Sequence, residues 1–114
     1  FPAGTTQSEE VAPPFGKDKD NFVAAFSNFG AEIDLTATGV GVISTWPGGH
    51  AVLDGTSMAC PAATGAAAAS LSTHAELLDL PRGSARAEAL VRAVLGRAES
   101  LGFGSLYEGQ GLAR

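Results

Sequence analysis

Basic residues, histidine and cysteine are scarce in this sequence. Its 114 residues include seven Lys and Arg against twelve Asp and Glu, which gives a formal net charge of −5. Scattered and outnumbered cations do not build the basic surface that nucleic acid or an anionic membrane requires, so we predict neither of these partners. The single cysteine, Cys60, excludes an internal disulfide, and with only two histidines it offers no cluster of metal ligands. We therefore predict no metal site and no cofactor.

Long apolar runs are also missing. The alanines at 66–69 form a run too short and too weakly hydrophobic to cross a bilayer, and no basic region followed by an apolar core marks a signal peptide. The remaining composition, 45% hydrophobic and 17% charged, is typical of a globular protein, and the length allows one domain. Residues 1–20 hold few apolar anchors and are expected to form a surface loop or arm.

The most informative stretch is 53–70, which reads LDGTSMACPAATGAAAAS. Its Asp-Gly pair is typical of a turn, and Thr56 and Ser57 are typical of a helix start. The small apolar residues that follow predict a helix over 57–73 that is buried on nearly every face. Because the first N–H groups of a helix have no partner inside it and carry the positive end of its dipole, we expect the Ser57 hydroxyl beside a ready-made oxyanion site.

Three residues inside this helix refine the prediction. Pro61 favours a start close to Ser57, since proline deeper in a helix would cost about 3 kcal/mol. Gly65 costs about 1 kcal/mol relative to alanine, so we interpret it as the mark of a tight contact. Cys60 lies among alanines and is interpreted as a buried structural thiol rather than a reactive one.

Further elements are predicted on both sides of this helix. Apolar or alternating segments bounded by turn residues predict three upstream strands, at 21–26, 32–37 and 40–46. Pro-Gly-Gly at 47–49 and the returning segment at 50–53 complete a hairpin that leads into Ser57. Downstream, Ser84 is expected to open a second, amphipathic helix that ends near Glu99 and covers a sheet. Its apolar stripe consists of Ala87, Leu90, Val91, Val94, Leu95 and Ala98.

Residues 55–61, GTSMACP, resemble the nucleophile motif of the subtilisin-like serine proteases. The resemblance extends from about Phe22 to Leu112, with similar segments at 26–30, 33–40, 44–49, 65–68 and 107–112. It implies an α/β fold, the C-terminal portion of a subtilisin-like domain in which strands and a hairpin lead into a buried helix. The first residues, which start at Phe1 rather than Met, resemble the middle of such a domain. We therefore expect the C-terminal part of a longer protease.

The resemblance also implies the chemistry. Ser57 would be the nucleophile of a serine endopeptidase, attacking a peptide carbonyl and forming an acyl-enzyme. Its N–H would donate to the oxyanion, and Thr56 would flank that site and help to shape it. Neither His50 nor His74 matches the family's catalytic histidine.

The remaining catalytic groups of the family lie earlier in its chain order. These are the aspartate, the histidine and the asparagine that completes the oxyanion hole. Asp34 and Asp54 lie in segments unlike the aspartate motif, and we interpret them as strand or turn residues. We therefore expect the Asp and His of the triad to come from a part of the protein not in this chain, and we predict that this chain alone is inactive.

Two functions stay open. The first is a serine endopeptidase acting on polypeptides, whose partner is the N-terminal part of the same protease or another copy of the chain. The second is a catalytically inactive subtilase remnant that acts as a binding or assembly module. Asp and His motifs in the source reading frame or in a companion chain would distinguish them. The family resemblance alone suggests secretion.

Overall fold

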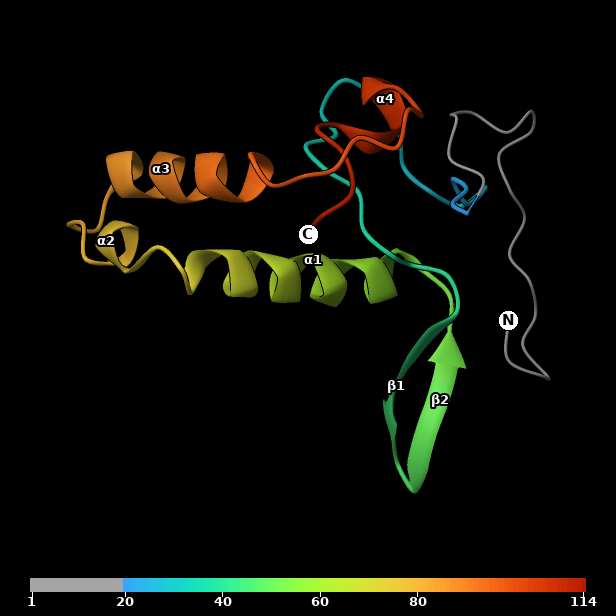
Figure 1. The fold of residues 1–114 in the computed structure, drawn as a ribbon. Helices are drawn as coiled ribbons and strands as arrows, with labels where there is room; N and C mark the ends of the chain where they lie inside the picture. The colour runs from blue at the N-terminus through green and yellow to red at the C-terminus, as the bar shows by residue number, and fades with distance from the viewer. Residues whose placement is uncertain (1–19) are drawn as a thin grey trace.

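The computed structural model describes residues 20–114, so the loop or arm predicted at 1–20 lies, except for Asp20, outside the described residues. Within that range a two-stranded sheet precedes four helices. The elements are β1 (Val42–Trp46), β2 (Gly49–Leu53), α1 (Thr56–Leu71), α2 (Ala75–Leu78), α3 (Ser84–Leu95) and α4 (Ser105–Glu108). Helices α1 and α3 lie side by side, and the hairpin projects from the start of α1 (Figure 1). This mixture of helices and strands confirms the predicted α/β class.

The hairpin forms as predicted. β1 and β2 pair antiparallel, with Val42 opposite Leu53 and Trp46 opposite Gly49. Gly48 adopts a φ of 86°, a left-handed value that glycine reaches without strain. The Pro-Gly-Gly signal therefore identified the turn and, with it, the two strands that the turn joins.

The strands predicted at 21–26 and 32–37 do not form as continuous strands. Ala24 makes a single bridge, and the chain turns directly after it, where the Ser27 N–H donates to the Ala24 carbonyl at 2.9 Å. Leu35 and Thr36 make isolated bridges to residues of the C-terminal segment. A strand needs a neighbour along its length to satisfy its backbone groups, and residues 20–114 supply only these short contacts.

Helix α1 has nearly the predicted bounds, but the predicted burial is wrong. Ser70 is its one buried residue, and Cys60 is exposed rather than buried. A Cβ added at Gly65 would meet nothing within 4 Å, so that glycine marks no tight contact. Among the described elements α1 packs mainly against α3 and α2, and these two helices cover a small part of its surface. The small side chains of α1 would allow other segments to pack closely on it, but residues 20–114 do not provide such segments.

Helix α3 begins at Ser84 as predicted and ends at Leu95, and the chain continues to Ala98 in tighter turns, in which the Arg97 N–H donates to the Val94 carbonyl and the Ala98 N–H to the Leu95 carbonyl. The apolar stripe is only partly covered. Leu90 and Val94 are half-buried, whereas Ala87 and Val91 are exposed. The helix therefore covers α1 and α2 with one part of its stripe and leaves the other part open.

The buried hydrophobic residues of the described part belong to segments outside the two long helices. They are Ala24, Leu101 and Phe103. The C-terminal segment packs closely against earlier backbone, because a Cβ at Gly109 would overlap the Asp34 carbonyl and a Cβ at Gly111 would overlap the Glu99 carbonyl. These two glycines allow residues 110–113 to bond backbone to backbone with both segments, through Gln110, Gly111 and Ala113 to residues 34–36 and through Leu112 to Glu99.

Candidate active site

The turn that precedes α1 is held by backbone contacts from the start of the hairpin. The Gly55 N–H donates to the Gly39 carbonyl at 2.7 Å, and the Asp54 carboxylate accepts from the Gly41 N–H at 2.7 Å. A Cβ at Gly39 would lie 2.9 Å from the Gly55 carbonyl oxygen, so the close approach needs a glycine. Asp54 therefore has the turn role predicted for it.

The sequence reasoning missed the part that Gly39 and Gly41 play in holding this turn. Their spacing is a usable signal, because two glycines just before a β-strand allow close backbone contact. Their partners, however, lie on the far side of the hairpin. Only the observed register of β1 and β2 brings the two places together.

Gly55 determines where α1 starts. Its φ of 153° lies in the region that favours glycine, and its carbonyl accepts hydrogen bonds from the Met58 and Ala59 N–H groups. The first helical residue is consequently Thr56, one residue before the predicted start. Ser57 occupies the second position of the helix.

The Ser57 side chain is exposed, and its backbone groups are not used by the helix. Within residues 20–114 the N–H groups of Thr56 and Ser57 have no acceptor. Pro61 lies inside α1 and has no N–H, so the Ser57 carbonyl lacks the donor that a helix normally supplies four residues later. A hydroxyl and an N–H are thus both accessible at the positive end of a helix dipole.

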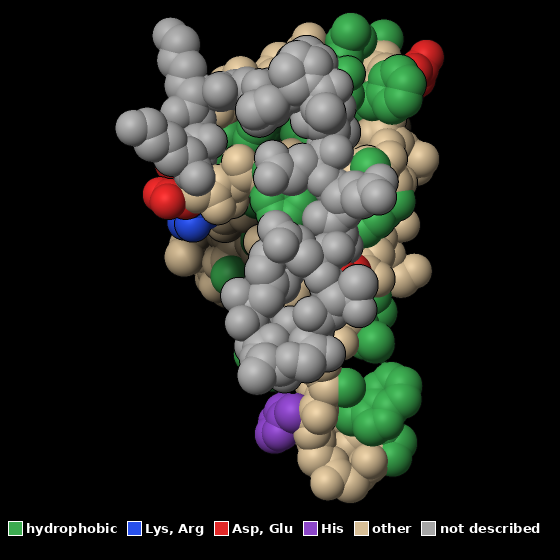
Figure 2. Space-filling view, turned by 90° about the vertical axis from the view of Figure 1, so that its right-hand side faces the viewer, with side chains coloured by type: hydrophobic (Ala, Val, Ile, Leu, Met, Phe, Trp, Pro, Cys, Tyr) green, Lys and Arg blue, Asp and Glu red, His purple; other side chains and the backbone are tan. Residues whose placement is uncertain are grey.

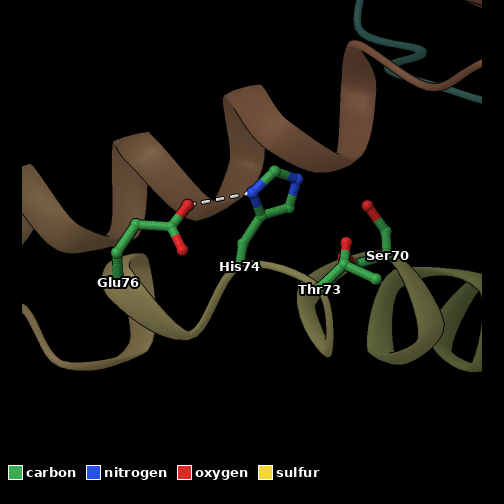
Figure 3. A network of polar contacts seen from close by, with 4 residues as sticks. All are labelled: Ser70, Thr73, His74 and Glu76. Carbon is green, nitrogen blue, oxygen red and sulfur yellow. Dashed lines mark hydrogen bonds and ion pairs between the residues drawn. The ribbon is translucent and has the colours of Figure 1, made fainter.

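The two histidines are engaged elsewhere. His50 is exposed in β2, opposite Thr45. His74 lies just beyond the other end of α1, where its Nδ1 is 3.0 Å from the Glu76 carboxylate (Figure 3). No hydrogen bond joins either histidine to Ser57, so the described residues provide Ser57 with no general base.

The pair of His74 and Glu76 closes the corner between α1 and α2. A hydrogen bond from its own backbone N–H and one from His74 lower the pKa of the Glu76 carboxyl. Next to this pair, the Thr73 hydroxyl donates to the Ser70 carbonyl at 2.8 Å (Figure 3). These contacts give His74 a place in the helix corner rather than beside the candidate nucleophile.

A hollow of about 370 Å³ borders the start of α1. Thr56 and Ala59 line it on the helix side, residues 36–40 line it along the chain that enters the hairpin, and Phe103 lies on the C-terminal side. The hairpin itself carries exposed apolar side chains, among them Ile43 and Trp46. Hydrophobic side chains are visible along the projecting end of the molecule (Figure 2).

Between residues 20 and 114, no three His, Cys, Asp or Glu side chains gather closely enough to hold a metal ion. No helix in that range combines the length and the apolar character needed to cross a bilayer.

An exposed serine thus lies at the start of a helix of small residues, directly after a glycine turn and a hairpin. The chain belongs to the subtilase family, whose sequence profile matches residues 4–111. This match confirms the resemblance drawn from residues 55–61 and their flanks.

Several subtilases are similar to this chain over part of its length. Subtilisin BL from Lederbergia lenta is 54% identical over 52 residues, 45% of this chain and 19% of the relative. Alkaline elastase YaB from Bacillus sp. strain YaB is 54% identical over 69 residues, 60% of this chain and 18% of the relative. Halolysin from Haloferax mediterranei is 42% identical over 76 residues, 65% of this chain and 14% of the relative. The matched segment thus spans less than a fifth of each of these relatives.

Proposed function

We propose that this chain is the nucleophile-bearing C-terminal part of a subtilisin-like serine endopeptidase that acts on polypeptides. The Ser57 hydroxyl attacks the carbonyl carbon of a peptide bond, the amine leaves, and water hydrolyses the resulting acyl-enzyme. One observation carries the proposal. In a chain of the subtilase family, Ser57 is exposed at the second position of α1.

The oxyanion site is proposed at the same helix start. The Ser57 N–H, which has no acceptor within residues 20–114, donates to the developing oxyanion, and the exposed Thr56 hydroxyl flanks it. Donors aimed at the oxyanion matter because charge develops there in the transition state, and one such donor contributes about 10² to 10³ in kcat. The open helix N-terminus adds a favourable dipole.

The base and its aspartate are proposed to come from the N-terminal part of the same protease. The placement of His50 in the hairpin and of His74 at the far corner of α1 supports this inference. The exposed surface of α1, the exposed Trp46 and the hollow beside Thr56 supply an apolar face for that part to cover. The family resemblance also leads us to infer that the whole protease is secreted.

A fluorophosphonate probe tests the proposal, because it labels serines that a neighbouring base activates. The chain alone should label weakly and should not turn over a chromogenic peptide. Adding a subtilase N-terminal segment that bears the Asp and His should raise the labelling. Ser57→Ala should abolish the increase, and Ser70→Ala, which removes a buried hydroxyl, should leave it in place. Labelling that is indifferent to the added segment or to Ser57→Ala would contradict the proposal.

The lack of a base for Ser57 within residues 20–114 favours one alternative function, a catalytically inactive remnant that acts as a binding or assembly module. The same experiment distinguishes the two. An inactive remnant would bind the added segment, visible as a complex in size-exclusion chromatography, without any labelling of Ser57. An endopeptidase fragment would gain both the complex and the labelling.

A further inference from the structure

The outer side of α3 carries an open apolar row. Ala87, Val91 and Leu95 follow one another at intervals of four residues, so they align nearly along the helix axis. Together with Gly96 and Gln110 they line a groove of about 620 Å³. Val91, at the centre of the row, is 55% exposed. This side of the helix therefore has an apolar floor, in which Ala87 and Val91 are exposed and Leu95 is half-buried.

Two opposite charges border the groove on one flank. Glu88 and Arg92 are one turn apart, both are exposed, and both line the groove. Within residues 20–114 neither of them makes an ion pair. The other flank holds the half-buried Leu90 and Val94, where α3 packs against its helical neighbours. The groove is thus apolar in the middle, covered on one side and charged on the other.

We propose that this groove is an interface between two copies of the chain, with their α3 helices packed antiparallel about a two-fold axis level with Leu90 and Val91. In that arrangement Glu88 lies opposite Arg92 of the partner subunit, and the symmetry makes the contact twice. The two Val91 side chains meet beside the axis, because residues rise by about 1.5 Å each along a helix. A parallel packing would not bring the opposite charges together in this way.

The size of the groove sets the strength of the interface. Helix α3 has 12 residues and is about 18 Å long. One face of so short a helix cannot bury the roughly 800 Å² per partner of a standard interface. The association is therefore weak, in the micromolar range or above. It does not rest on the catalytic role proposed for Ser57, and Ser57→Ala leaves it unchanged.

Sedimentation equilibrium of the 114-residue chain, from micromolar to millimolar concentration, tests the interface. The chain should reach a dimer, and Val91→Glu should keep it monomeric over the same range. Ile43→Glu is the matched control, because it places the same charge on an exposed apolar residue of the hairpin and should leave the dimer intact. A monomer throughout, or a dimer that Ile43→Glu removes and Val91→Glu does not, overturns the proposal.

A charge exchange tests the orientation. Glu88→Arg and Arg92→Glu, each alone, place like charges opposite one another and should weaken the dimer about tenfold. The double variant restores opposite charges and should return the affinity to within about threefold of the original. Far-UV circular dichroism checks that each variant keeps its helices. Single variants that dimerise like the original chain, or a double variant no better than the singles, overturn the antiparallel arrangement.

Discussion

Glu108 keeps its charge although only 3% of its surface is exposed. Its carboxylate accepts the Leu101 N–H at 2.8 Å, the Ser100 hydroxyl at 2.9 Å and the Gly102 N–H at 3.2 Å. Burial raises the pKa of this carboxyl, but the hydrogen bonds from Leu101, Ser100, Gly102 and Phe103 together outweigh burial and lower it. Glu108 thereby ties the 100–103 loop to α4, next to the buried Leu101 and Phe103.

Replacing this carboxylate should destabilise the fold. In Glu108→Gln, an amide nitrogen would face N–H donors, so we expect a loss of about 1.5–3 kcal/mol in the free energy of unfolding. Urea unfolding at pH 7 measures it. Glu32→Gln, at an exposed residue, is the control and should change stability by less than about 0.5 kcal/mol. Equal midpoints for the two variants would contradict the structural role of Glu108.

The same residue predicts a pH dependence. The folded-state pKa of Glu108 lies below its ordinary value of 4.5, so the carboxyl binds a proton less readily in the folded chain than in the unfolded chain. Its stabilising contribution is present above pH 4.5 and disappears as the pH falls through the folded-state pKa. The stability difference between the original chain and Glu108→Gln should therefore be constant near neutral pH and shrink below pH 4.5. Urea titrations at several pH values measure that difference, and one that grows on acidification would refute this sign.

Among the elements, the turn before α1 depends on two backbones in contact. Gly39→Ala places a Cβ against the Gly55 carbonyl, which cannot move freely because Gly55 also bonds to Gly39. We expect this steric overlap to cost about 1–3 kcal/mol and to weaken the labelling of Ser57 in the reconstituted protein. Thermal unfolding and probe labelling measure the two effects.

Gly65→Ala is the opposite case within α1. A Cβ there meets nothing within 4 Å, and alanine is the better helix former. We expect a gain of about 0.5–1 kcal/mol in the stability of the chain alone, from thermal unfolding. If the N-terminal part of the protease packs closely on Gly65, the same variant should weaken the complex. A loss of stability in the chain alone would show that Gly65 already has a close neighbour.

Elements with local signals were predictable, and those that depend on distant neighbours were not. The Pro-Gly-Gly turn, the paired strands around it and the starts of α1 and α3 each follow from a few adjacent residues. The burial of α1 and the strands at 21–26 and 32–37 required cover and pairing that residues 20–114 do not contain. For the site, the position of Ser57 at a helix start was predictable, whereas the contact of Gly39 with Gly55 depended on the hairpin register.

At the scale of the whole molecule, more of the large hydrophobic residues in the described part are exposed than buried. Three hydrophobic residues are buried, whereas Phe29, Ile43, Trp46 and Val91 are each more than half exposed. We expect amides in the first turns of α1 to exchange rapidly with solvent in the chain alone and to become protected when the N-terminal part is added. Hydrogen exchange read by mass spectrometry measures both. Strong protection of α1 in the chain alone, equal to that of residues 101–103, would contradict this expectation.

The backbone bonds between the C-terminal segment and residues 34–36 have a consequence for synthesis. The Gln110 N–H donates to the Asp34 carbonyl and the Ala113 N–H donates to the Thr36 carbonyl, both at 2.8 Å. A ribosome adds about 5–20 residues per second, so residues 34–36 join the growing chain roughly 4–15 s before their partners do. The hairpin and α1 are therefore made while residues 34–36 still lack Gln110 and Ala113, their backbone partners. During that interval the Asp34 and Thr36 carbonyls lack the N–H donors that they have in the folded chain.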